Sequence, residues 1–148
     1  LESGTFNKAS NLREIRLHNN RIQNIERDVF YPLPSLLELH LQNNLITSIE
    51  PGAFHSLQSL EHVNLQENKL SELEDVFLHE SSSLLSIRLD SNHLTLLHND
   101  SLHEQFSIQI IWLGNNKLTK LDKSLFRDLH LIQRVYFRNN SINYIEDR

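Results

Sequence analysis

Apolar residues recur along the chain with a fixed period of 24 residues. Each repeat opens on leucine or isoleucine, at Leu12, Leu36, Leu60, Leu84, Ile108 and Ile132. A second apolar column follows three residues later, from Ile15 to Val135, and a third follows five residues later, from Leu17 to Phe137. Polar residues stand mostly between these columns, so the first half of each repeat predicts a short strand. Successive strands about 4.8 Å apart then stack into one parallel sheet.

Asparagine stands eight residues after the opening residue of every repeat. The column consists of Asn20, Asn44, Asn68, Asn92, Asn116 and Asn140. The chain must turn inward after each strand, and this bend leaves backbone groups unpaired. A side-chain amide both donates and accepts hydrogen bonds, so it can satisfy these groups. We therefore interpret the column as a structural asparagine ladder.

The combined pattern, L-x-x-L-x-L-x-x-N-x-L, resembles that of the leucine-rich repeat family over nearly the whole chain. A further apolar column consists of Phe6, Phe30, Phe54, Leu78, Leu102 and Phe126. The repeat length and the phenylalanines are similar to the extracellular subclass of chaoptin-like adhesion proteins, Slit-type guidance proteins and Toll-type receptors. The resemblance implies an α/β solenoid of horseshoe shape. Its parallel sheet would line the concave face, and its convex segments would be irregular or short helices.

The repeats predict that residues 1–148 form a single solenoid. Five repeats are complete, at 12–35, 36–59, 60–83, 84–107 and 108–131, whereas 1–11 end an earlier repeat and 132–148 begin a sixth. Solenoids need caps over their terminal repeats. Extracellular members usually carry cysteine-rich caps, and this chain has no cysteine. We therefore expect an internal fragment of a longer protein, with its caps missing.

The convex side is predicted to contain stacked phenylalanines. A leucine column three places later is interrupted in two repeats, and its members are Leu33, Leu57, Ser81, Gln105 and Leu129. We therefore expect segments 80–83 and 99–106 to be less regular, with Phe106 repacking inward.

The net charge and the sequence motifs argue against several classes of function. The chain has 14 Lys and Arg residues against 19 Asp and Glu residues, a net charge of −5, which argues against a nucleic-acid partner. His79-Glu80 and His103-Glu104 lack the second histidine of a zinc-protease helix, and no other catalytic motif is found. No apolar run approaches the roughly 18 residues of a membrane span, so we expect no membrane contact within this fragment. No cofactor is predicted.

Three histidines lie diagonally across the predicted sheet, at His18, His40 and His62. They raise two alternatives, a metal-binding or pH-sensing group and ordinary solvated histidines. Diagonal neighbours about 7–8 Å apart make three ligands to one metal a strained arrangement. We favour solvated histidines and predict no metal site.

Two sequons, Asn99-Asp100-Ser101 and Asn139-Asn140-Ser141, are candidate glycosylation sites at Asn99 and Asn139. The first lies on a predicted convex loop, where a glycan would leave the concave sheet free. The alternative is an ordinary polar loop.

The outward places of the last strands carry residue types that are typical of binding hot spots. The predicted site consists of Arg88, Ile110, Trp112, Gly114, Arg134, Tyr136 and Arg138. Trp112 and Tyr136 share one column on adjacent strands, so we expect their rings to touch. Gly114 beside them removes side-chain bulk and leaves room for a ligand group.

Together these features predict a non-catalytic protein-binding module of a secreted or cell-surface protein. Its partner would be a protein ligand or another cell-surface protein, bound through the concave sheet. The resemblance implies cell adhesion or receptor recognition. The alternatives are a segment of a Toll-type innate immune receptor and a structural spacer or matrix segment whose contacts lie on the convex side.

Overall fold

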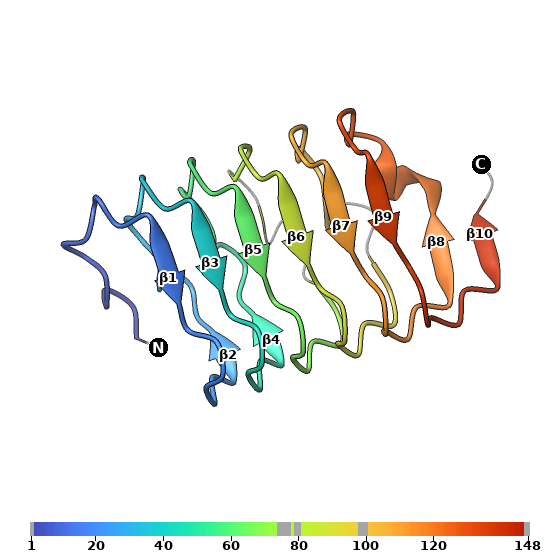
Figure 1. The fold of residues 1–148 in the computed structure, drawn as a ribbon, viewed down its shortest axis with the longest axis horizontal. Coiled ribbons are helices and arrows are strands. Elements are labelled where there is room, and N and C mark those ends of the chain that lie inside the picture. Colours follow the sequence, from blue (N-terminus) through green and yellow to red (C-terminus); the bar gives the residue numbers. More distant parts are fainter. Residues whose placement is uncertain (1, 74–77, 79–80, 98–100, 147–148) are drawn as a thin grey trace.

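The computed structural model describes residues 2–73, 78, 81–97 and 101–146, without the side chains of Lys123 and Glu146. Successive turns of the chain stack along one axis into an elongated solenoid (Figure 1). One strand from each turn contributes to a sheet that runs the length of the molecule. The predicted leucine-rich repeat solenoid is therefore confirmed.

The long sheet has six parallel strands in the order β1-β3-β5-β6-β7-β9. Their bounds are Glu14–Arg16, Glu38–His40, His62–Asn64, Ser86–Arg88, Ile110–Trp112 and Arg134–Tyr136. Each strand pairs with the next in the register of the 24-residue period, for example Ile15 with Leu39. The same register places Trp112 between Arg88 and Tyr136.

Shorter elements form the other side of the solenoid. Strands β2 (Asn24–Ile25) and β4 (Ser48–Ile49) pair in parallel, as do β8 (Lys120–Asp122) and β10 (Tyr144–Glu146). The 3-10 helix η1 (Lys123–Phe126) begins where the Asp122 carboxylate accepts a hydrogen bond from the Ser124 amide. Elsewhere the described part of this side consists of turns, bends and irregular backbone, as the resemblance implies for the convex segments. The predicted segments 80–83 and 99–106 lie partly outside the described residues.

The apolar columns form a continuous core between the sheet and these loops. Leu36, Leu39 and Leu41, one from each strand column of the same repeat, are fully buried. Burying such a side chain contributes about 1.5–3 kcal/mol, so each repeat adds its own share of hydrophobic stabilisation. Because every turn packs only on its neighbours, the core extends in one dimension.

The phenylalanine column stacks beneath the convex loops. The ring centroids of Phe6 and Phe30 are 6.1 Å apart, those of Phe30 and Phe54 are 5.9 Å apart, and both pairs are nearly parallel. Phe126 instead meets Phe137 edge to face at 6.4 Å. The predicted stacking is confirmed for Phe6, Phe30 and Phe54.

Hydrogen bonds replace apolar packing where the leucine column is interrupted. Ser81 is completely buried and donates to the Phe54 carbonyl at 3.0 Å, and buried Gln105 donates to the Leu78 carbonyl at 3.1 Å. The prediction that Phe106 repacks inward is wrong. Its side chain is 47% exposed and stacks on the His130 ring, because Gln105 already occupies the interior position.

The asparagine ladder connects neighbouring turns as predicted. The Asn92 oxygen accepts a hydrogen bond from the Leu70 amide at 3.0 Å, and its nitrogen donates to the carbonyls of Leu65 and Leu89 at 3.0 and 3.1 Å. Equivalent bonds are made by Asn44, Asn68, Asn116 and Asn140. At the first position, the bonds that Asn20 forms with described residues are donated to two carbonyls within its own turn.

The residue before each ladder asparagine has a positive φ. These residues are Asn19, Asn43, Glu67, Ser91, Asn115 and Asn139, with φ between 54° and 59°. Asparagine tolerates this left-handed conformation better than other non-glycine residues. Four of the six turns therefore use asparagine where many proteins use glycine, which accounts for the low glycine content.

Candidate binding site on the concave face

Three side chains form a continuous stack across the outward face of β6, β7 and β9. The Trp112 and Tyr136 ring centroids are 5.8 Å apart, and their planes differ by 13°. On the other side, Arg88 Cζ lies 5.3 Å from the Trp112 ring centroid, within the range of a cation–π contact. The predicted contact between the two rings is therefore present, and Arg88 extends it to a third strand.

A hollow of about 370 Å³ adjoins this stack. It is lined by Arg88, Asp90, Trp112, Gly114, Tyr136 and Arg138. Five of the seven predicted site residues meet here. Ile110 and Arg134 are register partners at the start of β7 and β9, outside the lining.

Sequence reasoning did not include Asp90 in the site. Its carboxylate lies 3.4 Å from Arg88 Nε, and its side chain is only 14% exposed. Asp90 stands 24 residues before Gly114 and 48 before Arg138, in the same outward column. Its place in this column is the sequence feature that identifies Asp90 as a neighbour of the predicted site residues.

The space beside Gly114 is partly filled by the side chain of Arg138. A Cβ atom on this residue would lie 3.1 Å from Cγ of Arg138 and 3.6 Å from its Nε. The aliphatic stem of Arg138 therefore takes part of the room that the glycine leaves. The glycine allows this arginine to lie close against the backbone just after strand β7, where Arg138 and Trp112 line the same hollow.

The charges around the hollow are not balanced. Arg88 is paired with Asp90, but neither Arg134 nor Arg138 forms an ion pair with any residue that the structure describes. Tyr136, between these arginines along β9, is 42% exposed. This end of the concave face thus offers accessible aromatic surface beside two arginines that have no ion-pair partner in the described part of the chain.

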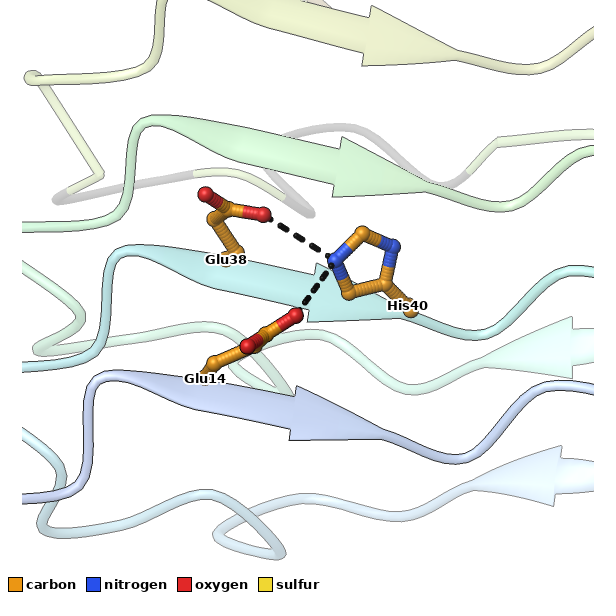
Figure 2. Close-up of side chains that lie close together, drawn as sticks. All are labelled: Glu14, Glu38 and His40. Carbon is orange, nitrogen blue, oxygen red and sulfur yellow. Dashed lines mark hydrogen bonds and ion pairs between the residues drawn. The ribbon is translucent and has the colours of Figure 1, made fainter.

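A second cluster lies at the other end of the sheet. His40 Nε2 is 3.1 Å from a Glu38 carboxylate oxygen and 3.3 Å from a Glu14 oxygen (Figure 2). A hydrogen bond from Arg16 is the main cause of a lowered pKa at Glu14. The side-chain oxygen and nitrogen atoms with which Glu14, Glu38 and His40 could bind a metal lie within 4.8 Å of one another. Arg16 already engages Glu14, however, so the contacts describe a network of polar side chains, and the absence of a metal site stays a prediction.

The three diagonal histidines have separate environments. His40 belongs to the cluster of Figure 2, and His62 Nδ1 lies 2.7 Å from the Ser86 hydroxyl. His18 Nδ1 is buried and has no hydrogen-bond partner among the described residues. All three histidines are partly buried rather than fully exposed to solvent, and the structure does not bring them together as one group.

Of the two glycosylation candidates, Asn99 lies outside the described residues. Asn139 is exposed, and its side-chain nitrogen donates to the Asn115 amide oxygen at 2.8 Å. Glycosylation at either position stays a prediction.

These features define a solenoid repeat protein with one long parallel sheet along its concave face. The sequence matches the leucine-rich repeat family over residues 10–70 and 36–94, more than half of the chain. The chain therefore belongs to the leucine-rich repeat family. No curated protein sequence matches it.

Solved structures share this fold. The leucine-rich repeat domain of APL1B has a TM-score of 0.84 and 23% identity, over 99% of this chain and 42% of that one. FLRT2, in a complex with Latrophilin 3 and Unc5D, has a TM-score of 0.80 and 25% identity, over 88% of this chain and 40% of that one. TLR13, in a complex with single-stranded RNA, has a TM-score of 0.74 and 27% identity, over 88% of this chain and 20% of that one. The chain thus spans less than half of each neighbour.

The similar solved structures bear on the predicted class of partner. The acidic net charge argues against a nucleic-acid partner, but the exclusion of nucleic acid is not supported, because TLR13 has a similar fold and is bound to RNA in its structure. No helix in the described ranges is long and apolar enough to cross a membrane.

Proposed function

We propose that the chain is a non-catalytic protein-binding module of an extracellular protein and that it binds its partner through the concave sheet. The observation that carries the proposal is the stack of Arg88, Trp112 and Tyr136 beside an open hollow. Tryptophan, tyrosine and arginine dominate the binding energy of protein interfaces, because they bury a large area and still form polar contacts.

The rigidity of the stack supports this role. Each ring packs against its neighbour on an adjacent strand, and the strands are held in register by the sheet. Side chains that are already ordered lose little conformational entropy when a partner covers them, so more of the contact energy appears as affinity.

We further propose cell adhesion or receptor recognition as the setting, with a protein ligand or another cell-surface protein as partner. The fold of FLRT2, seen in a complex with two other proteins, supports this proposal. A Toll-type receptor segment is the alternative, supported by the likeness to TLR13.

A convex contact surface is the competing candidate, as expected for a spacer segment. Tyr31, in the loop between β2 and β3, is 46% exposed and stacks on the His55 ring at 5.2 Å. This pair is the counterpart of Trp112 and Tyr136 on the other side of the solenoid, so it provides a matched control.

The test is a binding screen with a multimerised form of the chain against an array of extracellular protein domains. Each partner found is then measured with Trp112→Ala and with Tyr31→Ala. We expect Trp112→Ala to weaken binding about 30-fold, as for a hot spot of about 2 kcal/mol, and Tyr31→Ala to change it less than about twofold. Circular dichroism checks that both variants fold. Loss of binding in Tyr31→Ala with full binding in Trp112→Ala would establish the convex alternative.

A further inference from the structure

We propose that the hollow beside Gly114 receives a carboxylate from an acidic segment of the protein partner and that Arg138 pairs with it. This inference rests on the proposed function, since it concerns the same surface, and it adds the chemistry by which the partner is recognised.

The first argument is the cost of covering Arg138. A partner that contacts Trp112 and Tyr136 must also cover the hollow between them and Arg138. A guanidinium removed from water without a counter-charge is strongly destabilised. Asp90 is the acidic residue that lines the hollow, and it is already engaged by Arg88. The anion for Arg138 therefore has to come from the partner.

The second argument is the position of Arg138. Its stem lies against Gly114, where a Cβ would be 3.1 Å from Cγ and 3.6 Å from Nε. This close approach restricts the side chain before any partner binds. A guanidinium presents a planar fork of N–H donors that matches the two oxygens of a carboxylate, so a restricted arginine gives both affinity and orientation.

The third argument is size and composition. The hollow of about 370 Å³ is much larger than a single ion, and the Trp112 and Tyr136 rings border it. Such a space suits an aspartate or glutamate side chain together with a neighbouring apolar or aromatic residue, which would pack on the exposed Tyr136 ring.

The rest of the sheet favours an acidic protein segment over RNA. A nucleic-acid strand gains affinity from many phosphate contacts along its length. Beyond β6, the sheet presents Glu14 and Glu38 at its other end. A row of phosphates along the sheet would meet these two carboxylates, whereas a side-chain carboxylate confined to the hollow does not reach them. Asp90 does not separate the two ligands, because it lines the hollow and is paired with Arg88.

The experiment uses the fluorescence of Trp112, which is the only tryptophan of the chain and so reports on this site. The probes are the capped peptide Gly-Asp-Phe-Glu-Gly and its uncharged analogue Gly-Asn-Phe-Gln-Gly. We expect the acidic peptide to bind at least about tenfold more tightly than the analogue, with the preference reduced by salt. Arg138→Gln should abolish the preference. Arg21→Gln, which removes an exposed arginine outside the hollow, should preserve it.

Each other outcome has a defined meaning. Equal binding of the two peptides, or no binding of the acidic peptide up to about 5 mM, overturns the carboxylate site. Tighter binding of a ten-nucleotide uridine RNA than of the acidic peptide, lost in Arg138→Gln, assigns the hollow to phosphate instead. The proposed function fails separately, when Trp112→Ala leaves a partner from the binding screen fully bound.

Discussion

The asparagine ladder allows a quantitative test with an internal control. Asn92→Ala removes a buried amide that connects two turns, whereas Asn20→Ala removes an exposed amide whose hydrogen bonds stay within one turn. The two substitutions are chemically identical and occupy the same place in the repeat. Any difference in their effects therefore measures what the connection between turns contributes.

The expected loss of unfolding free energy follows from the backbone groups that lose Asn92 as a hydrogen-bond partner. The Leu70 amide has Asn92 as its acceptor, and a buried N–H without a partner costs about 1–3 kcal/mol. The carbonyls of Leu65 and Leu89 lose one donor each but keep another, from Asn68 and Asn116. These two lost bonds add about 0.5 kcal/mol each, toward the lower end of the usual range. We expect Asn92→Ala to destabilise the chain by about 3 kcal/mol.

Asn20→Ala should cost about 0.5 kcal/mol. Its two bonds, to the carbonyls of Leu17 and His18, are exposed to water, which can replace them, and the Leu17 carbonyl keeps the Asn44 amide as a donor. The two variants should therefore differ by about 2–3 kcal/mol. For a chain of this length such a difference corresponds to about 5–10 °C in Tm.

Urea unfolding followed by circular dichroism measures both variants against the unchanged chain. A loss below about 1 kcal/mol in Asn92→Ala, or equal losses in the two variants, would refute the argument that the ladder stabilises the solenoid by satisfying buried backbone groups. A broader transition in Asn92→Ala alone would agree with it, because weaker coupling between turns reduces the cooperativity of a solenoid.

Three further predictions concern stability. Phe30→Ala should cost about 3–5 kcal/mol in urea unfolding because the ring is buried in the stacked column, whereas Phe106→Ala should cost less than about 1 kcal/mol because its ring is half exposed. Glu67→Asn should raise stability by about 0.5–1 kcal/mol, because asparagine tolerates the positive φ of this turn; no gain in Tm would contradict this. The hydrogen bond from His103 lowers the pKa of Asp128, so this carboxylate stabilises the fold above its unfolded pKa of about 3.9 and loses that effect as the pH falls through its lower folded pKa. Asp128→Asn should therefore be less stable than the unchanged chain at pH 7 but approach it at pH 2, and parallel urea curves with a constant gap would contradict the assignment.

The repeat period accounts for what could be predicted from sequence. Strand positions, register, the phenylalanine stack and the ladder all depend on residues that recur every 24 positions, and each turn repeats the same packing. The same logic placed Trp112 beside Tyr136, because cross-strand neighbours on one face follow directly from the register.

Features that depend on side-chain conformation were not predicted. The period shows that Gly114 and Arg138 share a column, but it does not show that the arginine stem lies across the glycine. It also shows that His18 and His40 occupy outward places, but not that His40 pairs with two glutamates while His18 remains apart. The inward position of Phe106 was wrong because a polar residue, Gln105, fills the interior.

The ladder and the candidate binding site meet at Gly114, just after strand β7. The Asn116 side chain donates to the carbonyls of Leu113 and Gly114 at 3.2 and 3.3 Å, on the side of the backbone that faces the core. The Gly114 carbonyl also accepts the Ser91 amide, which joins it to the preceding turn. Gly114 has no side chain to anchor it, so these backbone bonds fix the strand against which Arg138 lies. The asparagine column inside the solenoid, which recurs in every repeat, thus holds an outward column whose residues differ from repeat to repeat, so outward residues can be substituted without altering the fold.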